Sequence, residues 1–300
     1  MHKPTSILVT GANGQLGSEL QALSSHYNQY RFTFVDRSDI DLNDTEAIEH
    51  YFKEKTFDTI INCAAYTAVD HAESNPDLAD NINHKAVKTL ATIAKATNTT
   101  LIHISTDYVF NGKNFQPYVE TDPTDPQNVY GKTKLAGERA LLSINPPNAV
   151  IIRTSWVYSS FGNNFVKTML RLGKERDELG VIFDQVGTPT YARDLAEAIL
   201  TIILNPEPQS PNPTEIYNYS NEGVCSWYDF TKAIFELSDI NCRINPIETK
   251  EYPTPAARPS YSLLNKSKIK TAYSLKIPYW RDSLKICLDE LEKPGDTNAK

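Results

Sequence analysis

The chain has 300 residues, of which 40% are hydrophobic and 22% are charged, and it carries a formal net charge of −7. This balance is typical of a folded globular protein of roughly two domains and excludes a disordered chain. The acidic charge disfavours a general role in nucleic-acid binding, and no apolar run approaches the ~20 residues that span a bilayer.

Cysteine and histidine usage bears on compartment and metal binding. The four cysteines (Cys63, Cys225, Cys242 and Cys287) form no C-x-x-C pair, and the six histidines are dispersed. The first ten residues lack the apolar stretch of a signal peptide. We therefore expect reduced thiols, a cytoplasmic protein that needs no membrane, and no metal site.

Short β-branched or aromatic runs alternate with helix-like stretches through the first half of the chain. The predicted strands are residues 6–10, 31–35, 59–63, 101–105 and 150–154, and the predicted helices are residues 14–24, 44–55, 77–97 and 132–142. This alternation indicates right-handed βαβ crossovers. The predicted fold class is therefore α/β, with a doubly wound, Rossmann-like parallel sheet.

The second half is less regular. Further strands are predicted at 181–183 and 216–219, helices at 194–204 and 227–237, and proline-rich loops at 205–213 and 252–259. We expect a dinucleotide-binding domain over residues 1–155, completed by strands and a helix from 181–220. Residues 156–180 and 221–300 would form a smaller, interleaved C-terminal lobe that binds the substrate.

A glycine turn follows the first predicted strand. Gly11, Gly14 and Gly17 are spaced G-x-x-G-x-x-G and open the first helix. Such a turn allows a tight bend and a close backbone approach to pyrophosphate, and the free N–H groups of the helix N-terminus favour an anion. The spacing predicts a dinucleotide site.

The end of the second strand bears on cofactor choice. Asp36 stands where a carboxylate would bind the ribose hydroxyls of NAD, whereas the neighbouring Arg37 would pair with the 2′-phosphate of NADP. The two residues favour different cofactors, so NADPH and NADH both remain open. Asp41 and Leu42 would contact the adenine edge or belong to a helix-capping loop.

Tyr130 and Lys134 are four residues apart and, on a helix, share one face. A free tyrosine has a pKa near ~10 and is a poor acid–base catalyst at neutral pH. A neighbouring ammonium and the positive charge of oxidised nicotinamide both stabilise the phenolate, so we expect Lys134 and the bound cofactor to lower the pKa of Tyr130. The alternative is a tyrosine packed on a surface helix.

Thr106 and Asp107 follow the fourth strand, at the carboxyl end of the sheet where ligands of doubly wound folds bind. The Thr106 hydroxyl could hold a substrate carbonyl beside the Tyr130 phenol. The alternative for this pair is a helix N-cap.

Residues 10–17, the Ser105-Thr106-Asp107 string and the pair Tyr130/Lys134 together resemble the extended short-chain dehydrogenases/reductases. Longer strings are similar to the dTDP-4-dehydrorhamnose reductases within that family: residues 62–70, 105–110, 130–137, 153–158, 162–169 and 253–259. The resemblance extends from about residue 6 to about residue 280.

The resemblance implies reduction of the C4 keto group of a dTDP-sugar by NADPH or NADH. It assigns Tyr130 as proton donor, Lys134 as its electrostatic partner, and the sugar to Thr106, Asp107 and Trp156. The implied cofactor contacts are made by Gly14, Gln15 and Leu16 to the pyrophosphate, by Asp36, Asp41 and Leu42 to the adenosine, and by Ala65, Tyr66 and Thr67 beyond the third strand.

Some members of this family are dimers bridged by Mg²⁺ through acidic side chains. Glu19 matches one such position, but Arg193 stands where a second carboxylate is expected. A cation at a ligand position opposes metal binding, so we doubt the Mg²⁺ bridge and leave monomer and homodimer open.

Two other functions remain possible on this scaffold: a sugar-nucleotide epimerase, and a non-catalytic nucleotide-binding regulatory subunit. The complete set of Thr106, Tyr130 and Lys134 favours the reductase.

Overall fold

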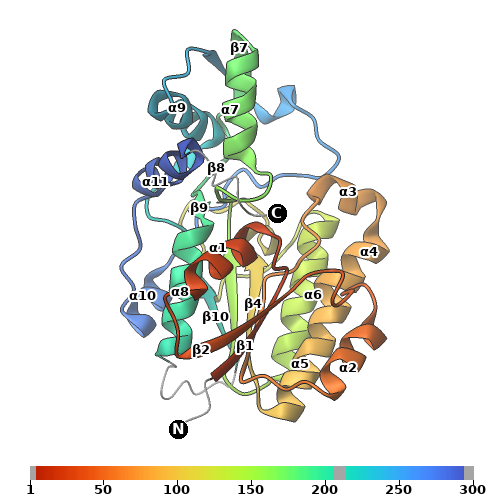
Figure 1. Cartoon of the computed structure of the whole chain (residues 1–300). Helices are drawn as coiled ribbons and strands as arrows, with labels where there is room; N and C mark the ends of the chain where they lie inside the picture. The colour runs from red at the N-terminus through yellow and green to blue at the C-terminus, as the bar shows by residue number, and fades with distance from the viewer. Residues whose placement is uncertain (1–4, 206–213, 294–300) are drawn as a thin grey trace.

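A six-stranded parallel sheet lies at the centre of the computed structural model, which describes residues 5–205 and 214–293. The strands follow the order β10-β5-β4-β3-β1-β2 (Figure 1). They are β1 (Thr5–Thr10), β2 (Tyr30–Val35), β3 (Thr59–Asn62), β4 (Thr100–Thr106), β5 (Ala149–Thr154) and β10 (Thr214–Asn218). The strand order reverses at β1, and at such a point doubly wound sheets bind nucleotides.

Helices cover both faces of this sheet, so its central strands are apolar on consecutive residues. Ile7, Leu8 and Val9 of β1 are fully buried. One face packs against α1 (Gln15–Ser24), α8 (Ala192–Leu204) and α10 (Ser267–Tyr273). The other face packs against α2 (Thr45–Lys53), α5 (Ala86–Thr97) and α6 (Val129–Ile144). The predicted α/β, doubly wound fold is confirmed.

The predicted helix at residues 77–97 is more complex than its sequence indicates. It begins as α4 (Pro76–Asp80), passes through a π-helical turn, η1 (Asn81–Lys85), and continues as α5. It ends at Asn98, whose left-handed φ of 55° forms the C-cap. A short helix that was not predicted, α3 (Val69–Ser74), precedes it.

A second apolar core lies beyond the carboxyl end of the sheet, at the top of Figure 1. It is built from α7 (Phe165–Glu175), β7 (Glu178–Ile182), α9 (Trp227–Leu237), β12 (Arg243–Ile247) and α11 (Trp280–Glu292). The strand predicted at 181–183 lies in β7, which pairs with β12 and not with the central sheet. By contrast, α8 and β10 pack with the core of the sheet. The division into a nucleotide-binding domain and a substrate lobe stays a prediction.

Short elements carry the chain between these two cores. They are η2 (Asp107–Val109), β6 (Val157–Tyr158), β8 (Val186–Gly187), β9 (Thr190–Tyr191), β11 (Cys225–Ser226) and η3 (Thr249–Glu251). The proline-rich segment 252–259 is irregular, as predicted, whereas residues 206–213 of the other predicted loop lie outside the described residues. All four cysteines are free thiols. In the described part of the chain, no helix combines the length and apolarity needed to cross a membrane.

Candidate active site

A cavity of about 1020 Å³ opens at the carboxyl end of the sheet. Its walls come from the segments that follow β1 to β5, from α6, and from the start of α7 and α9. Most of the residues that the sequence predicts for cofactor and substrate line this one cavity: Gly11, Gly14, Gln15, Leu16, Asp36, Asp41, Leu42, Ala65, Thr67, Thr106, Asp107, Tyr130, Lys134 and Trp156.

The glycine turn lies at the base of the cavity. Gly11 has a left-handed φ of 70°, and a Cβ there would approach the Ala64 backbone nitrogen to 2.8 Å. The α1 N-cap, Gly14, makes no side-chain capping bond, so the first N–H groups of α1 have no side-chain acceptor. This end of α1 is suited to an anionic pyrophosphate.

Asp36, at the end of β2, lies at the rim of the cavity. Its carboxylate accepts hydrogen bonds from Asn13 Nδ2 at 2.5 Å, from the Ser38 backbone N–H at 2.7 Å and from the Ser38 hydroxyl at 2.6 Å. The Ser38 hydrogen bonds hold the pKa of Asp36 below its ordinary value. Arg37 is exposed, with Nε 3.7 Å from Asp41 Oδ1. A carboxylate and a guanidinium are therefore adjacent at this rim.

Helix α6 brings Tyr130 and Lys134 to the opposite side of the cavity. Asn128 caps the helix by accepting a hydrogen bond from the Gly131 backbone N–H at 2.8 Å. Tyr130 is 9% exposed and Lys134 is 1% exposed. A lysine this deeply buried requires hydrogen-bonding partners, because transfer of an ammonium out of water is unfavourable.

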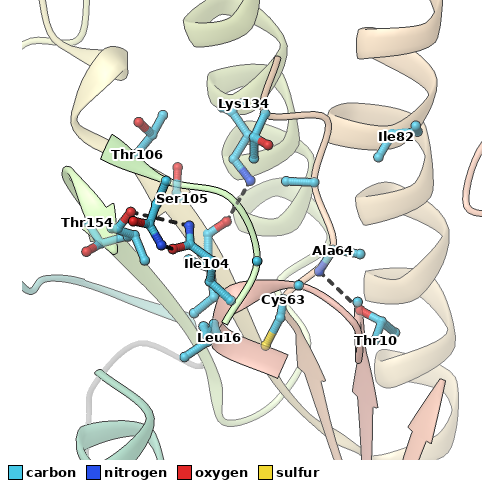
Figure 2. Close-up of a pocket in the computed structure, with 18 of the residues that line it drawn as sticks. Thr10, Leu16, Cys63, Ala64, Ile82, Ile104, Ser105, Thr106, Lys134 and Thr154 are labelled. Carbon is cyan, nitrogen blue, oxygen red and sulfur yellow. Dashed lines mark hydrogen bonds between the residues drawn. The ribbon is translucent and has the colours of Figure 1, made fainter. Parts of the chain in front are cut away.

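Burial raises the pKa of Tyr130 to about 12, while a hydrogen bond with Thr106 lowers it and the Asp107 charge raises it. Lys134 is not among the causes of this shift, and a lowering by Lys134 together with bound oxidised nicotinamide stays a prediction. Lys134 Nζ instead donates to the Ile104 carbonyl at 2.6 Å, as Figure 2 shows. The protonated phenol is the stable form of Tyr130 at neutral pH.

Lys134 itself is affected mainly by burial. Loss of solvent lowers its pKa to about 8, and the Glu138 carboxylate opposes this shift. Glu138, one turn further along α6, is fully buried and pairs with Arg153 of β5 at 2.7 Å. It also accepts a hydrogen bond from Ser105 Oγ at 2.5 Å. One carboxylate thus joins α6 to β4 and β5 directly behind the cavity.

Thr106 and Asp107 lie at the end of β4, facing the cavity (Figure 2 labels Thr106). Thr106 Oγ1 accepts a hydrogen bond from the Tyr108 backbone N–H at 3.2 Å and thereby caps the short helix η2, as the alternative interpretation expected. It also donates to Asp107 Oδ1 at 3.0 Å. Burial raises the pKa of Asp107 to about 7, and its Oδ2 has no hydrogen-bond partner among the described residues.

An aromatic wall closes the cavity on the side of the second core. Trp156 and Trp227 stack with ring centroids 3.6 Å apart, and Phe165 lies 4.5 Å from Trp227. Trp156 has a φ of 49°, which is rare for a bulky residue and turns the chain out of β5. This wall offers flat apolar surfaces that suit a base or a sugar ring.

Two predicted cofactor residues do not line the cavity. Gly17 faces the turn, where a Cβ would lie 2.2 Å from the Gly11 carbonyl oxygen, so its role is close packing of α1. The Tyr66 side chain packs with Ala72 and Tyr130, and its backbone N–H donates to Asn83 at 2.9 Å. Only Ala65 and Thr67 of this string lie on the wall.

Other wall residues were missed by the sequence interpretation. Asn164 donates through Nδ2 to Gln15 Oε1 at 3.0 Å and caps α7, and Trp227 begins α9. An asparagine that precedes apolar residues at 166, 169 and 170 is a helix-start signal, and this signal could have identified Asn164. No local pattern connects Trp227 with Trp156.

Glu19 and Arg193 are the two residues at which the resemblance bears on a bridging metal, and they lie close enough for their charges to interact. Burial raises the pKa of Glu19 to about 7, and the residue accepts a hydrogen bond from Ser159 Oγ at 2.6 Å. Arg193 Nη1 pairs with Glu290 Oε1 at 2.6 Å. The Arg193 guanidinium opposes the binding of a cation beside Glu19, and the expected absence of an Mg²⁺ bridge stays a prediction.

The parallel sheet, the glycine turn and the tyrosine–lysine pair facing one cavity define a Rossmann-type nucleotide-binding protein with an oxidoreductase site. The comparisons with known proteins narrow this class. Residues 5–293 match the family model described as the RmlD substrate binding domain.

Relatives match over nearly the whole chain. The dTDP-4-dehydrorhamnose reductase of Escherichia coli strain K12 is 42% identical over 95% of this chain and 98% of its own. The spore coat polysaccharide biosynthesis protein SpsK of Bacillus subtilis is 41% identical over 97% of this chain and 100% of its own.

Solved structures agree. A dTDP-4-dehydrorhamnose reductase from Clostridium acetobutylicum superposes with a TM-score of 0.89 at 42% identity and covers 96% of this chain and 99% of its own. The Bacillus anthracis enzyme in complex with NADP superposes with a TM-score of 0.90 at 37% identity and covers 96% of this chain and 100% of its own. The chain belongs to the RmlD family of extended short-chain dehydrogenases/reductases, as its motifs predicted.

Proposed function

We infer that this protein is a dTDP-4-dehydrorhamnose reductase, which uses NADPH to reduce the C4 keto group of dTDP-4-dehydro-L-rhamnose to dTDP-L-rhamnose. The observation that carries this conclusion is the meeting of Thr106, Tyr130 and Lys134 in the cavity that begins at the glycine turn. Relatives at about 40% identity over more than nine-tenths of the chain bear the same name.

The proton would come from Tyr130. Its phenol remains protonated at neutral pH because burial disfavours the phenolate, so it can donate to an oxygen on which negative charge develops. The Thr106 hydroxyl, which hydrogen-bonds Tyr130, would orient the same oxygen. When bound, the reduced nicotinamide supplies the hydride to the C4 carbon.

Lys134 and Asp107 would contact the two reactants, the dinucleotide and the sugar. Lys134, one helical turn from Tyr130 on the cavity wall, would hold the dinucleotide at the catalytic end of the cavity. Asp107 lies on the cavity wall, and its carboxylate suits a hydroxyl donor of the sugar. Trp156 would pack against the sugar ring.

The dinucleotide would bind along the other half of the cavity. The α1 N-terminus at Gln15 and Leu16 fits the pyrophosphate, Ala65 and Thr67 line its path, and Asp41 and Leu42 fit the adenosine. NADPH would be preferred because Arg37 is exposed and, paired with Asp41 only at 3.7 Å, can turn to a 2′-phosphate, while the Asp36 carboxylate is held by Ser38 and Asn13. NADH would be accepted less well. A cytoplasmic enzyme would meet both dinucleotides and its dTDP-sugar substrate there, as a monomer or a homodimer.

The test is a spectrophotometric assay of NADPH and NADH oxidation with the dTDP-4-dehydro sugar, with the product identified by NMR. We expect stoichiometric oxidation, faster with NADPH, and a C4 hydroxyl in the product. Sugar conversion without net oxidation would indicate an epimerase instead. Dinucleotide binding with no turnover would indicate the regulatory subunit.

A further inference from the structure

A chain of buried polar side chains runs under the cavity floor, across three strands of the sheet. Thr10 of β1 donates through Oγ1 to Asn62 Oδ1 of β3 at 2.7 Å. Asn62 Nδ2 lies 3.0 Å from His103 Nδ1 of β4, and His103 Nε2 lies 3.4 Å from Lys134 Nζ. None of the four residues is more than 2% exposed.

This chain has two ends, and both reach the cavity. Lys134 points to the Ile104 carbonyl at one end, and Thr10 accepts a long hydrogen bond of 3.5 Å from the Ala64 backbone N–H at the other, as Figure 2 shows. Asn62 and His103 do not line the cavity and so have no evident contact with a ligand. Polar groups this deeply buried weaken a fold unless they are paired, so their pairing calls for a reason.

A neutral imidazole has one donor and one acceptor nitrogen, so its tautomer is set by its two neighbours. In the arrangement found here, Asn62 Nδ2 donates to His103 Nδ1, which places the ring hydrogen on Nε2. That hydrogen faces Lys134 Nζ and can bond only to an uncharged amine with a free lone pair.

A second arrangement pairs the same groups when Lys134 is charged. With the Asn62 amide turned over, its oxygen faces His103, and the ring hydrogen moves to Nδ1. His103 Nε2 then accepts from the ammonium, and Asn62 Nδ2 donates to Thr10 Oγ1. Every member of the chain is hydrogen-bonded in both arrangements.

We propose that His103 is a positioning residue for Lys134: with Asn62 it forms a buried tautomer switch that keeps Lys134 hydrogen-bonded at the end of β4 whether or not the lysine carries its proton. The proposal extends the proposed function, because it concerns the lysine of the same site. It applies to the protein with or without bound dinucleotide.

The charges around the switch favour a neutral ring. Burial, and then the Lys134 charge, hold the pKa of His103 well below its ordinary value. Around Lys134, the titratable groups are Tyr130 and Glu138 on its own helix, His103 on β4, Asp107 after β4, and Arg153 on β5, which pairs with Glu138. The charged residues of α3, α4, η1 and α5, which also pack against α6, are all partly or fully exposed.

The switch can be observed directly by NMR of protein labelled with ¹⁵N-histidine, titrated across the ionisation of Lys134, whose pKa is about 8. We expect the His103 ring to stay neutral, with its hydrogen on Nδ1 at low pH and on Nε2 at high pH. The Lys134→Met variant should hold one tautomer throughout. A wild-type ring that keeps one tautomer across the titration, or becomes an imidazolium at pH 6, would overturn the proposal.

Two matched variants separate positioning from simple stability. His103→Gln places an amide near the position of Nε2 and can still bond Lys134, whereas His103→Asn can reach only Asn62. A hydrogen bond to an ammonium is stronger than one to a neutral amine, so losing the bond from both forms lowers the lysine pKa by about one unit. We therefore expect His103→Asn to move the alkaline limb of the kcat–pH profile down by about one pH unit, and His103→Gln to leave it in place.

Equal profiles for the two variants and the wild type would refute the positioning role, even if both variants melt at lower temperature. The NMR titration needs no turnover. If the protein fails to oxidise NADPH but the tautomer changes with pH, the proposed function fails and the switch stands. If it turns over and the tautomer is fixed, the switch alone fails.

Discussion

The two ends of the cavity differ in how the protein treats charge. At the catalytic end, burial is the largest influence on each group: it raises the pKa of Tyr130 and Asp107 and lowers that of Lys134. At the adenosine end, hydrogen bonds from Ser38 dominate and hold the pKa of Asp36 low. Water therefore screens the charges at the adenosine end of the cavity and not those at the catalytic end. Substitutions at the catalytic end should change rates, and those at the adenosine end should change affinity and selectivity.

The largest effect should follow from Tyr130→Phe, which removes the proton donor and little else. A positioned general acid contributes about 10²–10⁴-fold to a rate, so we expect kcat to fall within that range. The Kd for NADPH should stay near that of the wild type, because the ring and its contact with Tyr108 remain. Steady-state kinetics and fluorescence titration measure the two quantities. Turnover at the wild-type rate would remove Tyr130 from its assigned role.

The next effect concerns the buried ion pair behind the catalytic end. Glu138→Gln leaves the Arg153 guanidinium, 3% exposed, without its counter-charge. Breaking a buried pair in this way costs about 3–5 kcal/mol, so the free energy of unfolding should fall by that amount. Urea denaturation measures it.

Glu175→Gln provides the matched control for this pair. It breaks the pair of Glu175 with Arg171, in which both side chains are more than half exposed, and exposed pairs contribute about 0–1 kcal/mol. An equal fall in the free energy of unfolding of the two variants would show that burial does not distinguish the two ion pairs.

A smaller effect, confined to a pH window, should come from Glu19, which holds α1 against Ser159 below the second core. Burial raises the pKa of this carboxyl from its ordinary value of 4.5 to about 7. The folded state therefore binds a proton more tightly than the unfolded chain, and stability falls as pH rises from about 4.5 to about 7.

Glu19→Gln should remove this part of the pH dependence. Relative to the variant, the wild type should lose about 3 kcal/mol of unfolding free energy across that window, at 1.36 kcal/mol per unit of pKa shift. Denaturation at pH 5 and pH 7.5 measures it. A wild type that gains stability over this interval relative to the variant would reverse the assigned sign.

The smallest effect should appear at the adenosine end. Asp36→Asn keeps a hydrogen-bonding side chain but removes a negative charge next to Arg37. Since the 2′-phosphate then meets less repulsion, the ratio of kcat/KM for NADPH over NADH should rise several-fold, and the rise should shrink in high salt. An unchanged ratio would show that Asp36 does not influence the choice of cofactor.

The parts of the molecule that were predicted from sequence are those with local signals. The glycine turn lies within eight consecutive residues, and Tyr130 and Lys134 lie within one turn of a helix, so spacing alone brings them together. The central strands were found because helices cover both faces and leave consecutive apolar residues.

The remaining features depend on long-range packing. Trp227 meets Trp156 across 71 positions, and β7 pairs with β12 and not with the central sheet, neither of which a local pattern can indicate. The rise in the pKa of Tyr130 was not predicted because it depends on burial and on where Lys134 points, which only the folded structure gives.

The central claim is that the cavity joins a dinucleotide to a sugar carbonyl for direct hydride transfer, with Tyr130 as the acid. The most direct test uses NADPH in which both hydrogens at nicotinamide C4 are replaced by deuterium, with the dTDP-4-dehydro sugar, and NMR of the product. We predict one deuterium at the sugar C4 for each NADPH oxidised. A product that carries hydrogen in place of deuterium at the sugar C4 would contradict it.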